Sequence, residues 1–224
     1  ASDVYKRQIV KVTYRFPQVD AQWEITYKVF ANGIIKVDNR FVAEGTETPM
    51  IPRVGLRMQL SEILNDLTYY GRGPEENYRD RRTSQFIGEY TTPIKDLYEP
   101  YIRPQENEHR TDIYWCALTT KQKAGLLFIA DRTFELNASN YLLGSLDSGE
   151  TIDNGAPRTN ETNHRHLTDP QPVKQVDMFI DYRMMGVGGD NSWGAIAHEP
   201  YLIRPGVETV SYTHLRAHET RRHL

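Results

Sequence analysis

The sequence predicts an all-β fold, a large antiparallel β-sandwich. Short runs of alternating apolar and polar residues recur along the chain, and turn-forming residues separate them at short intervals. No helical periodicity lies between these runs. Tyrosine is abundant, with 14 residues beside 7 Phe and 3 Trp, and aromatic side chains favour the pleated surface of a sheet. A chain of 224 residues is long enough to bury a substantial core.

The alternation places the expected strands in chain order. In residues 23–30 (WEITYKVF) every second side chain is apolar, and the turn-like ANG that follows suggests a hairpin to the next run. SEILNDL, residues 61–67, is the only stretch with helical character, and it is too short to predict a helix. Further strands are expected at residues 34–44, 54–60, 113–118, 125–130 and 176–183.

Two stretches have a loop-like composition. Residues 71–112 are rich in Pro, Tyr and charge, and predict an ordered loop system with sparse strands, which is typical of a functional region or an interface. Residues 146–172 are polar throughout. In the first stretch, GRGPEEN lacks the third glycine of a nucleotide-binding motif, so it predicts a tight turn rather than a phosphate loop.

The two ends differ from the rest of the chain. Residues 2–8 and 210–221 resemble translated sequencing-adaptor read-through. We therefore predict a foreign leader at 1–8, a domain at 9–209 and a foreign tail at 210–224; a genuine basic tail is the alternative. Within the tail, HETRRH separates its histidines by five positions, unlike the four of a zinc-protease helix, so no metal site is predicted there.

Composition excludes several function classes. The net charge of −3 favours neither nucleic acid nor a membrane surface as a partner, and no apolar run approaches the roughly 18 residues of a membrane span. The only cysteine, Cys116, lies in an apolar run and is interpreted as a core residue, so no disulfide within the chain is expected. His164 and His166 could share a strand face and bind a metal, but a hydrogen-bonding role is the favoured interpretation.

Four glutamates raise the question of glycoside hydrolysis, which uses a pair of carboxylates. The sequence does not show which of them could pair, and six arginines nearby favour ion pairs instead. The glutamates are Glu75, Glu76, Glu106 and Glu108, and the arginines are Arg72, Arg79, Arg81, Arg82, Arg103 and Arg110.

The segment GVGGDNSWG, residues 186–194, places Trp193 in a glycine-rich loop. Its ring either fills a core beneath the loop or is held out for a ligand to stack on. The glycines allow a tight turn, and Asp190 and Asn191 are expected to fix the loop through bonds of the Asx type.

Three blocks together resemble one family. YYGRGPEENYRDR (69–81), YIRPQENEHRTD (101–112) and MGVGGDNSWG (185–194) are similar to the C-terminal domain of large bacterial β-galactosidases of glycoside hydrolase family 2. The resemblance covers most of residues 9–209 and implies a galactose-mutarotase-like supersandwich.

The resemblance implies a binding role without catalysis by this chain. The catalytic glutamates of the family, and the Mg²⁺ and Na⁺ that its members often use, belong to a (β/α)₈ barrel. No strand–helix alternation here predicts such a barrel, so neither catalytic residues nor cofactors are expected in this chain. By the resemblance, Trp193 stacks on the aglycone of a β-galactoside in the barrel's active site, and Asp190 and Asn191 position the loop. Asn191 stands where the family often has Asp.

The resemblance also assigns Arg103, Glu106, Asn107 and Arg110 to shaping the loops and the domain interface. It implies partners for the chain: a β-galactoside, the earlier domains, and further copies in a homo-oligomer. The compartment, bacterial cytoplasm or periplasm, stays open. Two other functions remain: a free-standing aldose 1-epimerase, with His164 and Glu106 as its acid–base pair, and a non-catalytic carbohydrate-binding module.

Overall fold

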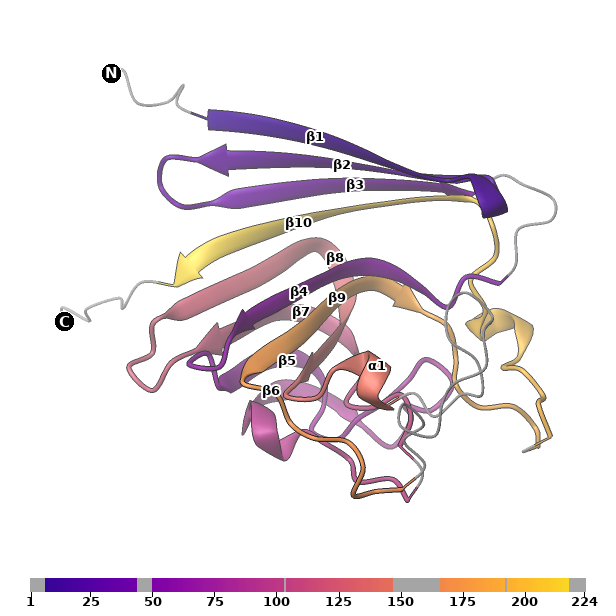
Figure 1. The fold of residues 1–224 in the computed structure, drawn as a ribbon. Helices are drawn as coiled ribbons and strands as arrows, with labels where there is room; N and C mark the ends of the chain where they lie inside the picture. Colours follow the sequence, from indigo (N-terminus) through magenta and orange to yellow (C-terminus); the bar gives the residue numbers. More distant parts are fainter. Residues whose placement is uncertain (1–6, 44–49, 103, 147–165, 192, 218–224) are drawn as a thin grey trace.

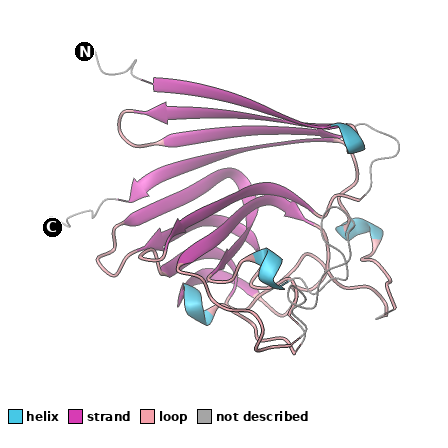
Figure 2. Ribbon diagram, viewed as in Figure 1, coloured by secondary structure: helices cyan, strands magenta, loops and turns pink. Residues whose placement is uncertain are grey.

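The computed structural model describes residues 7–43, 50–102, 104–146, 166–191 and 193–217. Ten strands form one antiparallel sheet, and the helices of this part of the chain are short (Figure 2). The strands are β1 (Arg7–Phe16), β2 (Ala21–Phe30), β3 (Ile35–Ala43), β4 (Arg53–Ser61), β5 (Asp66–Gly73), β6 (Phe86–Pro93), β7 (Arg110–Thr119), β8 (Gly125–Ser139), β9 (Gln175–Met184) and β10 (Val207–Ala217). The helices are α1 (Leu143–Leu146) and the 3-10 turns η1 (Pro17–Val19), η2 (Ile94–Asp96) and η3 (Glu199–Tyr201).

The sheet branches at β8, its longest strand. The main path runs β1-β2-β3-β10-β8-β7-β5-β6, and β9 joins β8 while also pairing with β4. The first part of β8, from Gly125 to Ala130, pairs with β10, whereas Glu135 to Ser139 pair with β9. Figure 1 shows β8 bending between the layer of β1, β2, β3 and β10 and the remaining strands. This bend curls the sheet into the expected antiparallel sandwich.

A single buried cluster joins the parts of the bent sheet. It contains side chains from β2, β3 and β10 on one arm and from β5, β7 and β9 on the other. Phe134 meets the edge of the Tyr212 ring at a centroid distance of 6.2 Å. Cys116 is fully buried, and burial raises the pKa of its thiol, so its interpretation as a core residue is confirmed.

The strands expected from alternation are all present. Most of their ends shift by a few residues, but β8 continues to Ser139, well past the end expected at residue 130. The run 61–67 forms no helix: β4 ends at Ser61, β5 begins at Asp66, and a turn closes with Leu64 N–H donating to Ser61 O. Leu67 and Tyr69 then point into the core from alternate positions of β5. Residues 71–112 are the expected loop system, interrupted by β6 and η2.

The last strand extends past the domain boundary expected at residue 209. β10 pairs with β3 from Val207↔Val42 to His214↔Ile35, and Tyr212 is 1% exposed. Residues 210–217 therefore belong to the sheet because they fill the gap between β3 and β8. The foreign origin of residues 1–8 and 210–224 stays a prediction.

Candidate substrate-facing site

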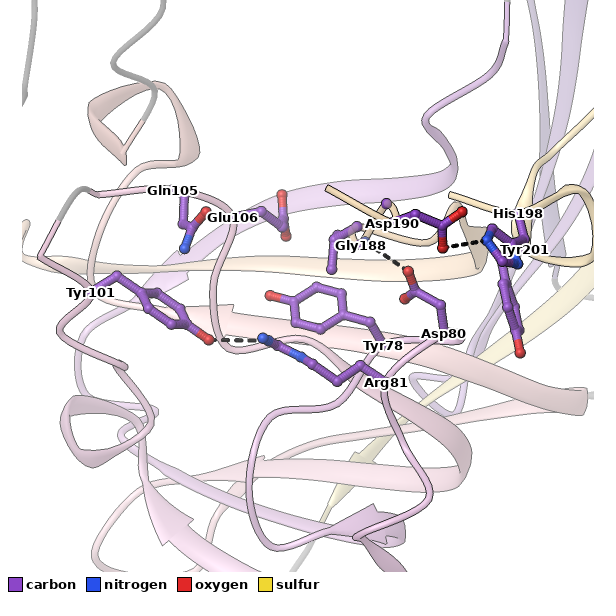
Figure 3. A pocket seen from close by; sticks show the side chains of 12 residues that line it. Tyr78, Asp80, Arg81, Tyr101, Gln105, Glu106, Gly188, Asp190, His198 and Tyr201 are labelled. Atoms are coloured by element: carbon purple, nitrogen blue, oxygen red, sulfur yellow. Dashed lines mark hydrogen bonds and ion pairs between the residues drawn. The ribbon is translucent and has the colours of Figure 1, made fainter. Parts of the chain in front are cut away.

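A cavity of about 390 Å³ lies where three loop segments meet. The segments are the β5–β6 loop, the segment leading into β7, and the residues that follow β9 (Figure 3). Its walls are aromatic and acidic, with Glu106 and Asp190 among the residues singled out in the sequence. The lining residues are Tyr78, Asp80, Arg81, Tyr101, Gln105, Glu106, Val187, Gly188, Gly189, Asp190, His198 and Tyr201.

The β5–β6 loop is attached to the start of β7 by Asn77. This side chain is completely buried, and its amide nitrogen donates to Arg72 O and Glu75 O, each at 3.1 Å. Its Oδ1 accepts from Thr111 N–H at 3.0 Å, and its backbone N–H donates to His109 O at 2.7 Å. Because its backbone N–H and both polar atoms of its side chain are engaged, the loop that carries Tyr78 and Asp80 is held against β7.

Glu76 ties the same loop to the segment before β7. Its carboxylate accepts from the Arg81 guanidinium, the Tyr101 hydroxyl and the Glu108 backbone N–H, the last at 3.0 Å. Arg81 also donates to Tyr101 Oη at 3.0 Å, as Figure 3 shows. Burial, together with the hydrogen bond to Glu76, raises the pKa of the Tyr101 hydroxyl. Glu76 is therefore a structural anchor, in line with the ion-pair interpretation.

Glu106 is held from the other side by β4. Arg53 lies 3.0 Å from its Oε1, and the Asn137 amide donates to the same oxygen at 3.2 Å. Arg53 also contacts the buried carboxylate of Asp181, with Nε and Oδ2 2.9 Å apart. The arginine that pairs with Glu106 among the described residues thus comes from a distant strand, and none of the five described arginines of the neighbouring sequence takes its place.

Asn107 and Arg110 also act within this loop system. Asn107 exchanges hydrogen bonds with the backbone of Glu99, at 2.9 Å and 2.6 Å. Arg110 donates to Tyr69 Oη at 3.1 Å, Glu108 O at 2.7 Å and Pro74 O at 3.1 Å. These contacts fit the predicted loop-shaping role. Arg103 lies outside the described residues.

The segment after β9, residues 186–198, is called the tryptophan loop below. Asp80 Oδ2 accepts the Gly188 N–H at 2.7 Å, and Asp190 Oδ1 lies 2.7 Å from His198 Nε2 (Figure 3). Asn191 Oδ1 accepts the Trp193 N–H at 2.8 Å, which is the expected Asx-type bond. Both side chains nominated for positioning the loop therefore bond within it.

Close backbone approach explains the glycines of this loop. A Cβ on Gly189 would lie 2.0 Å from Ala195 O, and Gly194 has a φ of +95°. Both positions therefore require glycine.

Trp193 does not fill a core. Its side chain is 94% exposed, although a buried indole contributes far more stability than an exposed one. Of the two interpretations of its position, the structure supports the ring held out from the loop.

The described contacts do not support the two alternative sites, the acid–base pair of His164 with Glu106 and the metal site at His164 and His166. His164 lies outside the described residues, so its suggested pairing with Glu106 has no described geometry. His166 is exposed, and its backbone N–H donates to Asp169. In the described part of the chain, no three His, Cys, Asp or Glu residues are close enough to hold a metal ion, and no helix there is long and apolar enough to cross a membrane.

Sequence reasoning missed several residues of this region. Asp80 and His198 anchor the tryptophan loop. Arg53, His109 and Asn137 form a hydrogen-bonded cluster that holds Glu106. Polar residues within otherwise apolar strands, such as Glu135 and Asn137 in FELNAS, are the sequence feature that could have indicated this cluster.

Comparison with known proteins decides the family. A family model described as the β-galactosidase small chain matches residues 1–215. The chain belongs to the β-galactosidase small chain family.

The curated proteins that this chain resembles are much longer than the chain itself. A β-galactosidase of Priestia megaterium is 31% identical over an alignment 212 positions long, which covers 88% of this chain and 19% of that protein. A β-galactosidase of Streptococcus thermophilus is 30% identical, over 87% of this chain and 18% of that protein. This small-chain member thus spans about a fifth of the length of the curated relatives it matches.

A solved GalM/aldose epimerase homologue from C. elegans is also similar. It covers 95% of this chain and 69% of its own, with 12% identity and a TM-score of 0.41. At this identity and TM-score, the similarity gives no information about the activity of this chain.

Proposed function

We propose that this chain is the part of a β-galactosidase that builds one wall of the active site and binds the aglycone of the substrate. The complete enzyme hydrolyses terminal β-D-galactose residues with retention of configuration, through carboxylates carried by another part of the protein. This chain contributes binding and structural support rather than the reacting groups. Its partners are the β-galactoside and the remainder of the enzyme, in a homo-oligomer.

The exposure of Trp193 is the observation that carries the proposal. An indole that is 94% exposed gives up the free energy of burial, so a soluble protein gains from it chiefly when a ligand or partner covers the ring. The face of an indole is electron-rich, and the C–H face of a sugar is apolar and slightly positive. Stacking then orients the aglycone without using hydrogen bonds.

The anchoring of the tryptophan loop supports the same role. Asp80, Asp190 and Asn191 each hold it by one hydrogen bond at 2.7–2.8 Å. A ring on a loop restrained at several points loses little further freedom on binding, which raises affinity. Glu106, Asn107 and Arg110 are proposed to hold the neighbouring loops in the matching shape.

A chimeric enzyme tests the proposal. The 224-residue chain replaces the matched segment of the P. megaterium relative, and hydrolysis of lactose is compared with that of the relative truncated before this segment. We expect the chimera to regain hydrolysis. A soluble, assembled chimera without hydrolysis would contradict the proposal, as would rapid mutarotation of galactose by the 224-residue chain alone, measured by polarimetry.

The source DNA offers a second test. We expect a barrel domain with two catalytic glutamates, either upstream in the same frame or in an adjacent gene. A frame that continues upstream without such a barrel, with none encoded beside it, refutes the assignment.

A further inference from the structure

A second cavity, of about 280 Å³, lies where the bend of β8 meets the β5–β6 loop and the end of β9. It shares no lining residue with the cavity beside the tryptophan loop. Four arginines face it, from three separate elements of the fold. The lining residues are Arg79, Arg82, Asp112, Arg132, Thr133, Phe134, Glu135, Tyr182 and Arg183.

The cavity contains two carboxylates, those of Asp112 and Glu135, and each has more than one positively charged or hydrogen-bonding partner. Asp112 accepts from Arg82 Nη1 at 2.9 Å and also from Arg72 Nε at 2.7 Å. Glu135 lies 3.1 Å from His109 Nε2, and its contact with Arg79 is long, at 3.8 Å. The four guanidinium groups therefore exceed the negative charge available to them.

Arg132 and Arg183 show this excess most clearly. Both guanidinium groups lie over the Tyr182 ring, with Cζ 5.5 Å and 5.3 Å from its centroid. Among the described residues, the one ion-pair contact of Arg132 is a loose one with Asp131, at 3.6 Å between two half-exposed side chains. Arg183 makes no ion pair with any residue in the described part of the chain. Two like charges thus share one aromatic ring, and of the two guanidinium groups only that of Arg132 has a carboxylate of the described residues within ion-pair distance.

The charged side chains that line the cavity are predominantly positive. Burial lowers the pKa of the Arg79 guanidinium; Glu135 opposes this effect, and the positive charges of Arg183 and Arg82 lower the pKa further. Like charges brought together in a partly buried space repel one another, and an anion placed between them relieves the repulsion. The arrangement is therefore complementary to a negatively charged ligand.

The shape of the arginine cluster favours a tetrahedral oxyanion. A planar guanidinium donates two parallel hydrogen bonds to phosphate or carboxylate oxygens. A carboxylate offers two oxygens in one plane, whereas phosphate accepts from several directions at once. Here the donors come from the β5–β6 loop (Arg79 and Arg82), from the bend of β8 (Arg132) and from the end of β9 (Arg183).

We propose that this arginine-lined cavity binds a phosphate group, either as inorganic phosphate or as the phosphate monoester of a small molecule. Arg132 and Arg183 supply the unmatched positive charge, and Arg79 and Arg82 close the opposite wall. The site is independent of the aglycone-binding role proposed for Trp193.

Thermal unfolding and calorimetric titration of the 224-residue chain test the proposal. Inorganic phosphate is added to protein in chloride buffer at constant ionic strength. We expect the Tm to rise by about 3 °C when phosphate exceeds its Kd tenfold. A second arm replaces phosphate with glucose 6-phosphate, and glucose is its control. Binding of both phosphates supports a monoester site, and binding of inorganic phosphate alone supports a site for the free ion.

Variants assign the effect to the cavity. Arg183→Gln and, separately, Arg132→Gln should each weaken phosphate binding at least tenfold without lowering the Tm in chloride, because each removes one of two repelling charges. Arg40→Gln is the matched control, since Arg40 makes an exposed ion pair with Glu24 on another part of the sheet. The proposal is overturned if phosphate stabilises no more than chloride does, or if both cavity variants bind phosphate as well as the unmodified chain.

Discussion

Arg53 and Glu106 lie 3.0 Å apart although 53 residues separate them in the chain. Arg53 opens β4, and Glu106 belongs to the loop segment before β7. The same guanidinium reaches Asp181 of β9, whose side chain is fully buried. One arginine thus links two strands to the loop that lines the cavity beside the tryptophan loop.

Replacing Arg53 with Met should be strongly destabilising. The change leaves the carboxylates of Glu106 and Asp181 without their cation, and loss of one partner of a buried pair costs about 3–5 kcal/mol. Urea unfolding followed by circular dichroism measures the loss. Arg40→Met, at an exposed ion pair, is the control and should change the free energy of unfolding by less than about 0.5 kcal/mol. Equal effects of the two variants would contradict a central role for Arg53.

Trp193→Ala should change substrate handling rather than stability. Because the side chain is 94% exposed, we expect the free energy of unfolding to change by less than about 0.5 kcal/mol. In the assembled enzyme, loss of stacking should weaken glucose binding by about 2- to 10-fold and alter the ratio of transglycosylation to hydrolysis. Product analysis with lactose measures this ratio.

The Trp193→Phe variant keeps an aromatic face and should fall between the Ala variant and the unmodified enzyme. If lactose kinetics stayed unchanged for Trp193→Ala while stability fell by about 3–5 kcal/mol, the ring would fill a core instead.

Stability should fall as the pH rises from about 4.5 to about 8, because of Glu108. Burial raises the pKa of its carboxyl to about 8; Ser139 and Arg110 oppose the shift, while Glu76 and Glu106 add to it. In this window the folded state keeps a proton that the unfolded state releases, so raising the pH favours unfolding. Below the window both states are protonated, and above it both are ionised, so the slope from this group vanishes.

Chemical denaturation across this pH range compares Glu108→Gln with the unmodified chain. The variant should show a flatter dependence on pH, because its amide does not ionise. Glu89→Gln, at an exposed position of β6, should leave the slope unchanged. An unaltered slope in Glu108→Gln would show that other groups set the pH dependence.

Gly189→Ala should loosen the tryptophan loop without unfolding the sheet. The added Cβ would lie 2.0 Å from Ala195 O, and overpacking costs about 1–3 kcal/mol. Hydrogen exchange of the Gly188 amide, which donates to Asp80, should accelerate about tenfold or more. Gly144→Ala, where a Cβ meets nothing within 4 Å, is the control. Unchanged exchange in Gly189→Ala would mean that the loop accommodates the methyl group.

Local sequence patterns were sufficient to predict most of the strands. Alternation in 23–30 and 176–183 predicts β2 and β9 because apolar residues at every second position line one face of a strand. In β9 the more polar face is buried as well, including Asp177 and Asp181. The same reasoning failed at residues 210–217, where charged and histidine residues hid a strand whose Val210 and Tyr212 are buried. A strand between two others is held by backbone hydrogen bonds, which do not depend on side-chain identity.

Local sequence patterns predict the all-β class, most of the strands, the burial of Cys116 and the motifs that resemble the β-galactosidase domain. These depend on residues near one another in the chain. The folded chain alone reveals that Trp193 is exposed and that Glu106 pairs with Arg53. It also reveals one cavity lined by four arginines, Arg79, Arg82, Arg132 and Arg183. These relationships join residues of separate strands and loops, and the bend of β8, together with the pairing of β9 and β4 beside it, brings them together. Contacts of this kind leave no period or spacing in the sequence, because side chains far apart in the chain meet only after the sheet has curled.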